Sequence, residues 1–123
     1  LLVEVGKATS SLGMNRFVKD ASALVLITLE PTNITSKLGC GIKDKDFPIM
    51  DLGIASAYMT LAAEDEGIGS CILGWFDEKK IKELVGIPKK KRLMLIISLG
   101  YNLKPKRKKI RKDFDKVVSF ENY

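Results

Sequence analysis

Two short apolar runs in the sequence predict buried strands. The first extends from Ala21 to Leu29 and is bounded by Asp20 and Pro31. The second extends from Leu93 to Leu99 and is followed directly by a glycine. Both runs contain β-branched side chains and are shorter than typical helices, which favours strands. We therefore expect two strands in the interior of the molecule.

The segment from Pro48 to Glu66 predicts a helix that is apolar or small on nearly every side. Such a helix must be covered all round, yet it is about 25 Å long at 1.5 Å per residue. A chain of 123 residues has difficulty surrounding it. Ala55, Ser56 and Ala62 would permit close approach of a second subunit, and Gly67 is placed to end the helix in a left-handed cap. The pattern therefore predicts a homodimer.

A shorter helix is predicted from Glu78 to Val85, where apolar residues recur at helical spacing. Asp77 is placed as its N-cap, and Gly86 ends it. Polar residues, glycines and a proline between Glu30 and Phe47 predict a long loop of the kind that is often functional. Val117 to Phe120 predict a short terminal strand or an extended arm. Because strands and helices alternate, the fold class is mixed α and β.

The N-terminal region holds weaker signals. Residues up to about Lys7 are interpreted as the end of a helix that begins upstream, and Gly13 and Asn15 indicate a turn. The sequence opens with Leu1 and not with Met. We interpret this beginning as the result of processing or of the loss of an N-terminal portion.

Composition limits the class of protein. Apolar residues make up 46% and charged residues 29% of the chain, which is typical of one globular domain and excludes a disordered chain. No apolar stretch reaches the ~20 residues of a membrane span. Cys40 and Cys71 are too isolated for a disulfide framework. Together with the lack of a secretory leader, they predict a cytoplasmic protein.

Histidine is absent from the sequence, which excludes Ser-His-Asp catalysis, Cys-His catalysis and imidazole metal sites. Without a histidine to activate it, Cys71 is better explained as a small core residue than as a nucleophile. Glu64, Asp65 and Glu66 are adjacent on a predicted helix, where neighbouring side chains point in different directions. Solvated surface is therefore favoured there, and we assign neither a catalytic side chain nor a metal site.

Positive charge is concentrated near the C-terminus. The net charge is +6, and residues 104–112 contain seven Lys or Arg and no acidic residue. Three interpretations stay open: a solvated tail, a nucleic-acid or other polyanion surface, and a clamp for the phosphate of a cofactor. No aromatic residue stands among the cations, which argues against nucleic acid. A second basic cluster, from Lys89 to Arg92, follows Pro88.

Three glycines, Gly67, Gly69 and Gly74, surround a short apolar run. Their spacing does not match a dinucleotide fingerprint or a Walker phosphate loop. One interpretation is a helix cap followed by a bulge beside a strand. The other is backbone that comes close to a planar ligand, with Ile72 and Leu73 packed on it. Under the same two interpretations, the neighbouring tryptophan is either partly buried core or the wall of a ligand site.

Six segments occur in an order and spacing that resemble the nitroreductase family of flavoproteins. No single segment is decisive, but the ordered set is fairly specific, and the resemblance runs from about Ala21 to the C-terminus. The segments are Asp51–Ala55, Leu61–Ala63, Glu66–Phe76, Val85–Pro88, Ser98–Tyr101 and Arg111–Val118.

The resemblance implies an α+β homodimer with a central mixed sheet flanked by helices, a long buried dimer-interface helix, and FMN at the subunit boundary. It also implies an FMN-dependent oxidoreductase that passes hydride from NAD(P)H through the flavin to nitro or quinone acceptors. By similarity, Ile72, Leu73, Gly74 and Trp75 would lie along the isoalloxazine ring, with the Gly74 amide near the flavin N5.

For the remaining parts, the resemblance implies that Lys109 and Arg111 contact the FMN phosphate and that residues from Val117 onward form an arm crossing to the partner subunit. The Arg-rich opening segment and the Pro-Ser-x-x-Asn loop of the family do not occur in the sequence. We therefore expect residues 1–123 to be a single nitroreductase-like domain that lacks its N-terminal portion. Two alternatives are a small basic polyanion-binding protein and a family member that binds flavin without reductase activity.

Overall fold

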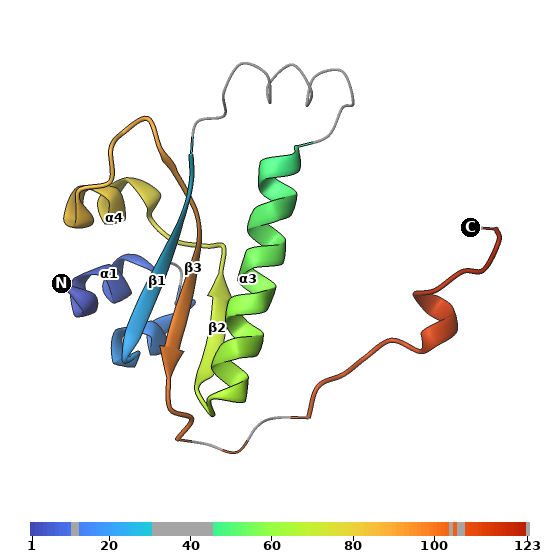
Figure 1. The fold of residues 1–123 in the computed structure, drawn as a ribbon. Coiled ribbons are helices and arrows are strands. Elements are labelled where there is room, and N and C mark those ends of the chain that lie inside the picture. Colours follow the sequence, from blue (N-terminus) through green and yellow to red (C-terminus); the bar gives the residue numbers. More distant parts are fainter. Residues whose placement is uncertain (11–12, 31–45, 104, 106–107, 123) are drawn as a thin grey trace.

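The computed structural model describes residues 1–10, 13–30, 46–103, 105 and 108–122. It confirms the α+β class, because helices and an antiparallel sheet occur together (Figure 1). The elements in chain order are α1 (Leu2–Ala8), the 3-10 helix η1 (Arg16–Asp20), β1 (Ala23–Leu29), α3 (Phe47–Asp65), β2 (Gly69–Leu73), α4 (Glu78–Val85), β3 (Arg92–Gly100) and the 3-10 turn η2 (Phe114–Lys116).

The sheet has the strand order β1-β3-β2, and both strand pairs are antiparallel. A mixed sheet was expected, but among the described residues the strand pairs are antiparallel and no parallel pair occurs. β3 lies in the middle, which explains why Ile96 and Ile97 are both completely buried. β1 is half-buried along most of its length because it has a neighbouring strand on one side only. The two strands predicted from apolar runs are thus confirmed, and the second is the more deeply buried.

The two faces of the sheet carry different helices. α3 lies along one face, while α1 and α4 lie on the other side (Figure 1). Because adjacent strand residues point to opposite faces, Ile96 joins the core on the α4 side and Ile97 points to the α3 side. The core cluster on the α4 side contains Val5, Ala8, Val18, Leu73, Ile81, Leu93 and Ile96.

Local signals in the sequence set the helix ends as predicted. An Asp77 carboxylate oxygen accepts a hydrogen bond from the Lys80 backbone N–H at 3.0 Å and caps α4. Gly86 ends that helix with a φ of 73°, and Gly67 follows α3 with a φ of 71°. Both are left-handed conformations that glycine adopts without steric cost.

The expected loop lies largely outside the described residues, whereas the expected terminal segment can be checked. Most of the expected loop between Glu30 and Phe47 belongs to the undescribed range 31–45, which also contains Cys40. At the other end, the chain leaves the sheet after β3 and runs away from it to the C-terminus (Figure 1). Residues 117–120 are not a strand there, so the structure agrees with the extended arm and not with the terminal strand.

Candidate functional site

Helix α3 is largely uncovered in a single chain. Among its residues, Ser56 and Ala63 are buried, whereas Tyr58 is 72% and Leu61 66% exposed. In the part of the chain that the structure describes, the chain itself thus leaves the helix uncovered, as was expected of a chain this short, and its burial by a second copy stays a prediction. The exposed large apolar side chains on this helix are Phe47, Ile49, Met50, Ile54, Tyr58, Met59 and Leu61.

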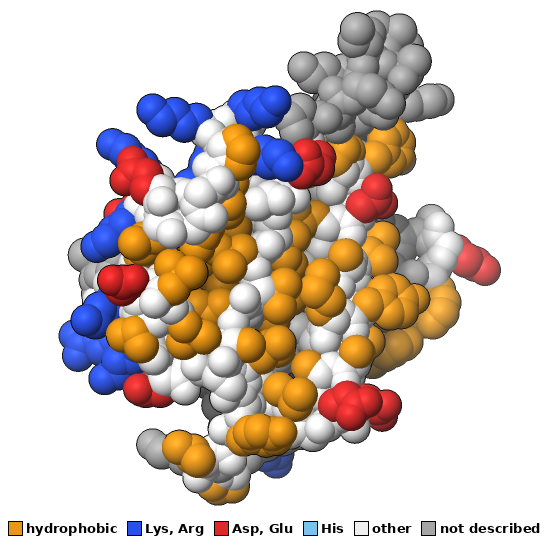
Figure 2. Space-filling view, turned by 60° about the vertical axis from the view of Figure 1, so that its left-hand side comes forward, with side chains coloured by type: hydrophobic (Ala, Val, Ile, Leu, Met, Phe, Trp, Pro, Cys, Tyr) orange, Lys and Arg blue, Asp and Glu red, His pale blue; other side chains and the backbone are white. Residues whose placement is uncertain are grey.

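The surface around the sheet is also apolar. Figure 2 shows hydrophobic side chains gathered across the middle of one face, with lysines and arginines along one side and acidic groups toward the rim. Monomeric proteins rarely expose large contiguous apolar patches, and those that do occur mark interaction sites. This face therefore has the character of a surface that another molecule covers.

A glycine inside α3 has no explanation within the chain. Gly53 is exposed, and a Cβ atom built there would meet nothing within 4 Å. Glycine in a helix interior costs about 1 kcal/mol relative to alanine, so a compensating reason is expected. Close approach of a neighbouring molecule to the helix backbone is such a reason.

The four residues that the resemblance placed along a flavin ring lie at the end of β2 and just beyond it. Ile72 is 45% and Trp75 54% exposed, whereas Leu73 is only 4% exposed and belongs to the core under α4. The prediction that the Leu73 side chain packs on a ligand therefore does not fit a single chain. The side chains of Ile72 and Leu73 point to opposite faces of the sheet because the two residues are adjacent in β2. A ligand on the Ile72 face can therefore contact the Ile72 side chain and the Leu73 backbone.

Gly74 is the most informative residue of this segment. It is exposed, and its backbone does not have the positive φ that would demand glycine. A Cβ atom at this position would make only an ordinary contact, at 3.9 Å, with the Leu95 side chain. Neither backbone conformation nor internal packing therefore requires glycine. A side chain at position 74 would hinder only a molecule that approaches the backbone from outside the chain. A planar ring stacked on the backbone is one such molecule.

The segment after Gly74 is attached to the N-terminal part of the chain. The Asn15 side-chain amide donates a hydrogen bond to the Trp75 carbonyl oxygen at 3.0 Å. The Asp77 backbone N–H donates to the Ala8 carbonyl oxygen at 2.9 Å. The sequence analysis indicated only a turn at Asn15 and missed the contact with Trp75. The signal that could have drawn attention to Asn15 is that Asn is favoured in left-handed conformations.

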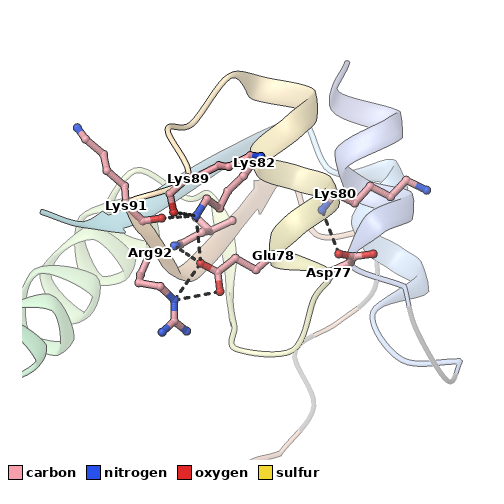
Figure 3. Close-up of polar contacts among 8 residues, drawn as sticks. Asp77, Glu78, Lys80, Lys82, Lys89, Lys91 and Arg92 are labelled. Atoms are coloured by element: carbon pink, nitrogen blue, oxygen red, sulfur yellow. Dashed lines mark hydrogen bonds and ion pairs between the residues drawn. The ribbon is translucent and has the colours of Figure 1, made fainter. Parts of the chain in front are cut away.

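A polar cluster joins the start of α4 to the start of β3 (Figure 3). The Glu78 carboxylate accepts hydrogen bonds from Arg92 Nε at 3.1 Å and from the Leu93 backbone N–H at 3.0 Å. The Lys82 ammonium lies 3.8 Å from Glu78 and donates to the carbonyl oxygens of Lys89 and Lys91. Part of the basic cluster after Pro88 therefore has a structural role.

These partners change the acidity of Glu78. Partial burial of the carboxylate raises its pKa, but the Leu93 N–H, the Arg92 side chain and the Lys82 charge together outweigh burial. The net effect holds the pKa of Glu78 below its ordinary value. Glu78 is thus a charged anchor between helix and strand.

Lys109 and Arg111 lie on the C-terminal arm and are exposed. The arm runs away from the sheet (Figure 1), so one chain does not bring these cations to residues 72–75. Arg111 donates a hydrogen bond to its neighbouring Ile110 carbonyl oxygen at 3.2 Å. Three other members of the basic run, at 104, 106 and 107, lie outside the described residues.

Two further predictions about single groups have different outcomes. Cys71 is exposed, so its interpretation as a core residue was wrong. The core cluster includes Leu73, which shares a face of β2 with Cys71, but it does not extend along the strand to Cys71. Glu64, Asp65 and Glu66 are exposed, as expected of solvated surface.

Within the described ranges, no three His, Cys, Asp or Glu side chains come together as metal ligands. Nor does any described helix have the length and hydrophobicity needed to cross a bilayer.

The sequence of this chain matches the model of the nitroreductase family over residues 3–101. The chain belongs to the nitroreductase family. The resemblance found from sequence motifs is therefore confirmed. No curated protein sequence matches the chain.

Solved structures share the fold of this nitroreductase-family chain. An FMN-dependent nitroreductase from Clostridium difficile R20291 is 27% identical, with a TM-score of 0.72 over 99% of this chain and 69% of its own. The NADPH:FMN oxidoreductase from Vibrio harveyi, solved with NAD+, is 20% identical, with a TM-score of 0.74 over 99% and 54%. NfrA1 from B. megaterium is 20% identical, with a TM-score of 0.72 over 98% and 54%. The chain spans about half the length of the last two proteins.

Proposed function

We propose that this nitroreductase-family chain is part of an FMN-dependent oxidoreductase that takes hydride from NAD(P)H and delivers it to nitro or quinone acceptors. The proposal is supported by the family match and by the named chemistry of the Clostridium difficile and Vibrio harveyi proteins. When bound, FMN supplies the hydride chemistry, and the protein supplies binding and orientation. The observation that carries the proposal concerns Gly74, which is exposed. Neither its backbone conformation nor the packing around it requires a glycine at this position.

In this proposal, the end of β2 forms one wall of the flavin site. The Gly74 backbone lets the ring approach closely, and the exposed side chains of Ile72 and Trp75 provide apolar contact beside it. Backbone N–H groups at this wall are fixed donors that stabilise negative charge on a bound ring without reorganising. The fold therefore contributes orientation and hydrogen bonds, and no side chain acts as an acid or base.

The phosphate of FMN is assigned to Lys109 and Arg111. In the part of the chain that the structure describes, neither makes an ion pair with an acidic side chain. Their charges are thus available to an anion, and charge-assisted hydrogen bonds from Arg and Lys to phosphate are among the strong ones. The other cations of residues 104–112 are then ordinary surface charge.

Two copies of the chain complete the site in this proposal. The open face of α3, the unexplained Gly53 and the half-exposed edge strand β1 all need a covering surface. A second copy offers the same apolar face, as a twofold interface requires. Its arm, from Val117 onward, would cross to the partner. The exposed free thiol of Cys71 suits the reducing cytoplasm, where we place the protein.

A titration of the purified protein with FMN tests the proposal, because Trp75 is the single tryptophan of the chain. FMN bound beside it should quench its fluorescence. The double variant Lys109→Ala, Arg111→Ala should bind FMN about 10- to 100-fold more weakly, through loss of two charge-assisted contacts. Gly74→Ala should also weaken binding while leaving the unfolding midpoint nearly unchanged.

The matched control is Lys108→Ala, Lys112→Ala, which removes the same charge from the same arm. It should bind FMN within about twofold of the parent, since non-specific attraction changes equally in both pairs. A purified protein that takes up no FMN contradicts the proposal. A protein that binds FMN but does not oxidise NADH or NADPH in the presence of an acceptor is the flavin-binding alternative without reductase activity.

A further inference from the structure

The loop before η1 and the segment after β2 meet through one side chain. The Asn15 carboxamide nitrogen lies 3.0 Å from the Trp75 carbonyl oxygen, although 60 positions separate the two residues in the sequence. The same nitrogen lies 3.4 Å from the Thr9 carbonyl oxygen. One amide group therefore bridges the end of α1 and the residue that directly follows Gly74.

Asn15 is itself held in place by its backbone. Its φ is 56° and its ψ is 22°, a left-handed conformation that Asn tolerates better than most residues. Its carbonyl oxygen accepts hydrogen bonds from the Val18 N–H at 3.0 Å and from the Ser10 hydroxyl at 3.3 Å. The Val18 bond is the shorter of the two, and the single Ser10 hydroxyl proton is shared with the Gly6 carbonyl oxygen, so the Asn15 backbone depends chiefly on Val18. The side-chain amide is directed by its own hydrogen bonds to the Thr9 and Trp75 carbonyl oxygens.

The segment after Gly74 is fixed on both sides of its exposed part. Leu73 precedes it in the sheet and is buried. Asp77 follows it, donates its backbone N–H to the Ala8 carbonyl oxygen and caps α4. The Asn15 hydrogen bond to Trp75 lies between these two anchors and holds the residue that directly follows Gly74. Glycine is the most flexible residue, so this contact limits the orientations open to its peptide groups.

We infer that Asn15 is a positioning residue, which tethers the Trp75 carbonyl and thereby orients the Gly74 backbone toward the ligand face. The inference rests on the proposed function in one respect, namely that this ligand is FMN. A tethered segment loses less conformational freedom when a ligand binds. Removal of the tether should therefore weaken binding even though Asn15 touches no reacting atom.

Two substitutions separate the side-chain donor from the backbone conformation. Asn15→Gly keeps the left-handed conformation and removes the donor. Asn15→Asp keeps the shape but turns an oxygen toward the Trp75 carbonyl. Both should increase acrylamide quenching of Trp75 in the FMN-free protein and weaken FMN binding about five- to tenfold. Circular dichroism checks that each variant is folded.

The matched control is Ser10→Ala, which removes a different side-chain contact of this loop, to the carbonyl oxygens of Gly6 and Asn15. It leaves the Asn15 amide in place. Its Trp75 quenching and its FMN affinity should equal those of the parent. A role of Asn15 in loop stability alone would instead give the same result for Ser10→Ala and Asn15→Gly, or would let Asn15→Asp restore the parent behaviour.

The outcomes for the two proposals can be told apart. If the parent protein binds no FMN, the proposed function fails, while quenching of Trp75 still decides whether Asn15 tethers the segment. If the parent binds FMN and both Asn15 variants match it in affinity and in Trp75 quenching, the inference about Asn15 is overturned. Weaker binding and a more accessible Trp75 in both variants, but not in Ser10→Ala, support it.

Discussion

The two faces of the sheet differ in how completely the chain covers them. On the α4 side, Val18 and Ile81 are fully buried, and charged groups at the edge are paired, as Glu78 is with Arg92. On the α3 side, large apolar side chains such as Tyr58 and Leu61 face outward. The layer between α4 and the sheet is therefore covered within the chain, although Leu1, Val3 and Phe17 near α1 are exposed, whereas α3 leaves most of its large apolar side chains uncovered. This difference indicates which face is made for stability and which for association.

The two faces also differ in the free energy that their apolar side chains contribute to folding of a single chain. Burying a large apolar side chain contributes about 1.5–3 kcal/mol, and the side chains under α4 contribute this within one chain. The exposed side chains of α3 can contribute it only when another surface covers them. Variants on the two faces should therefore behave differently, in unfolding on one side and in association on the other.

The largest effect is expected from truncation of the closed core. Ile81→Ala should lower the free energy of unfolding by about 2–5 kcal/mol, because it leaves a cavity among packed side chains. Leu61→Ala, on the open face, should change the unfolding of a single chain by only about 0.5 kcal/mol. Urea unfolding at low protein concentration measures both, and equal losses in the two variants would contradict the contrast between the faces.

A charge on the open face should act on association. Ile54→Asp places a carboxylate in the apolar surface of α3, where a partner would have to bury it without compensation. The dimer that we propose should weaken by about 100-fold or more, while circular dichroism of the chain stays unchanged. Light scattering after gel filtration measures the mass. The control is Glu83→Lys, which changes an exposed residue on α4. It should have the same mass in solution as the parent protein.

A smaller effect, dependent on pH, is expected at the edge of the closed face. The pKa of Glu78 in the folded chain lies below its ordinary value near 4.5. Its stabilising contribution is therefore fully present above that value and is lost as the pH falls through the folded pKa. Glu78→Gln should lower the free energy of unfolding by about 1–2 kcal/mol at neutral pH. The difference from the parent should shrink toward pH 3, and a constant difference would contradict the role of the charge.

The matched variant for this experiment is Glu83→Gln, an exposed carboxylate on the same helix. Exposed charges contribute little to stability, so its unfolding should follow the parent at every pH. Chemical denaturation at several pH values between 3 and 7 gives both curves.

The sequence predicted the elements well because their signals are local. Asp77, Gly86 and Gly67 set helix ends through their own backbone and near neighbours, and the structure has those ends where they were expected. The apolar runs gave the strands, and the family motifs gave the membership that the match over residues 3–101 confirms. For the candidate site, the sequence pointed to residues 72–75, and the exposure of Ile72 and Trp75 is in line with that hypothesis.

The sequence alone thus determined β1, β3, α3 and α4 with their ends, since each depends on residues close together in the chain, and it determined the family from the order of several segments. The strand β2 and the short helix η1 were not predicted. The tertiary structure decided that Leu73 faces the core, that Cys71 is exposed and that Asn15 reaches Trp75. These features depend on the strand order β1-β3-β2 and on which helix covers which face. The hydrophobic pattern predicts that a side chain is buried. Only the tertiary structure shows which surface it packs against.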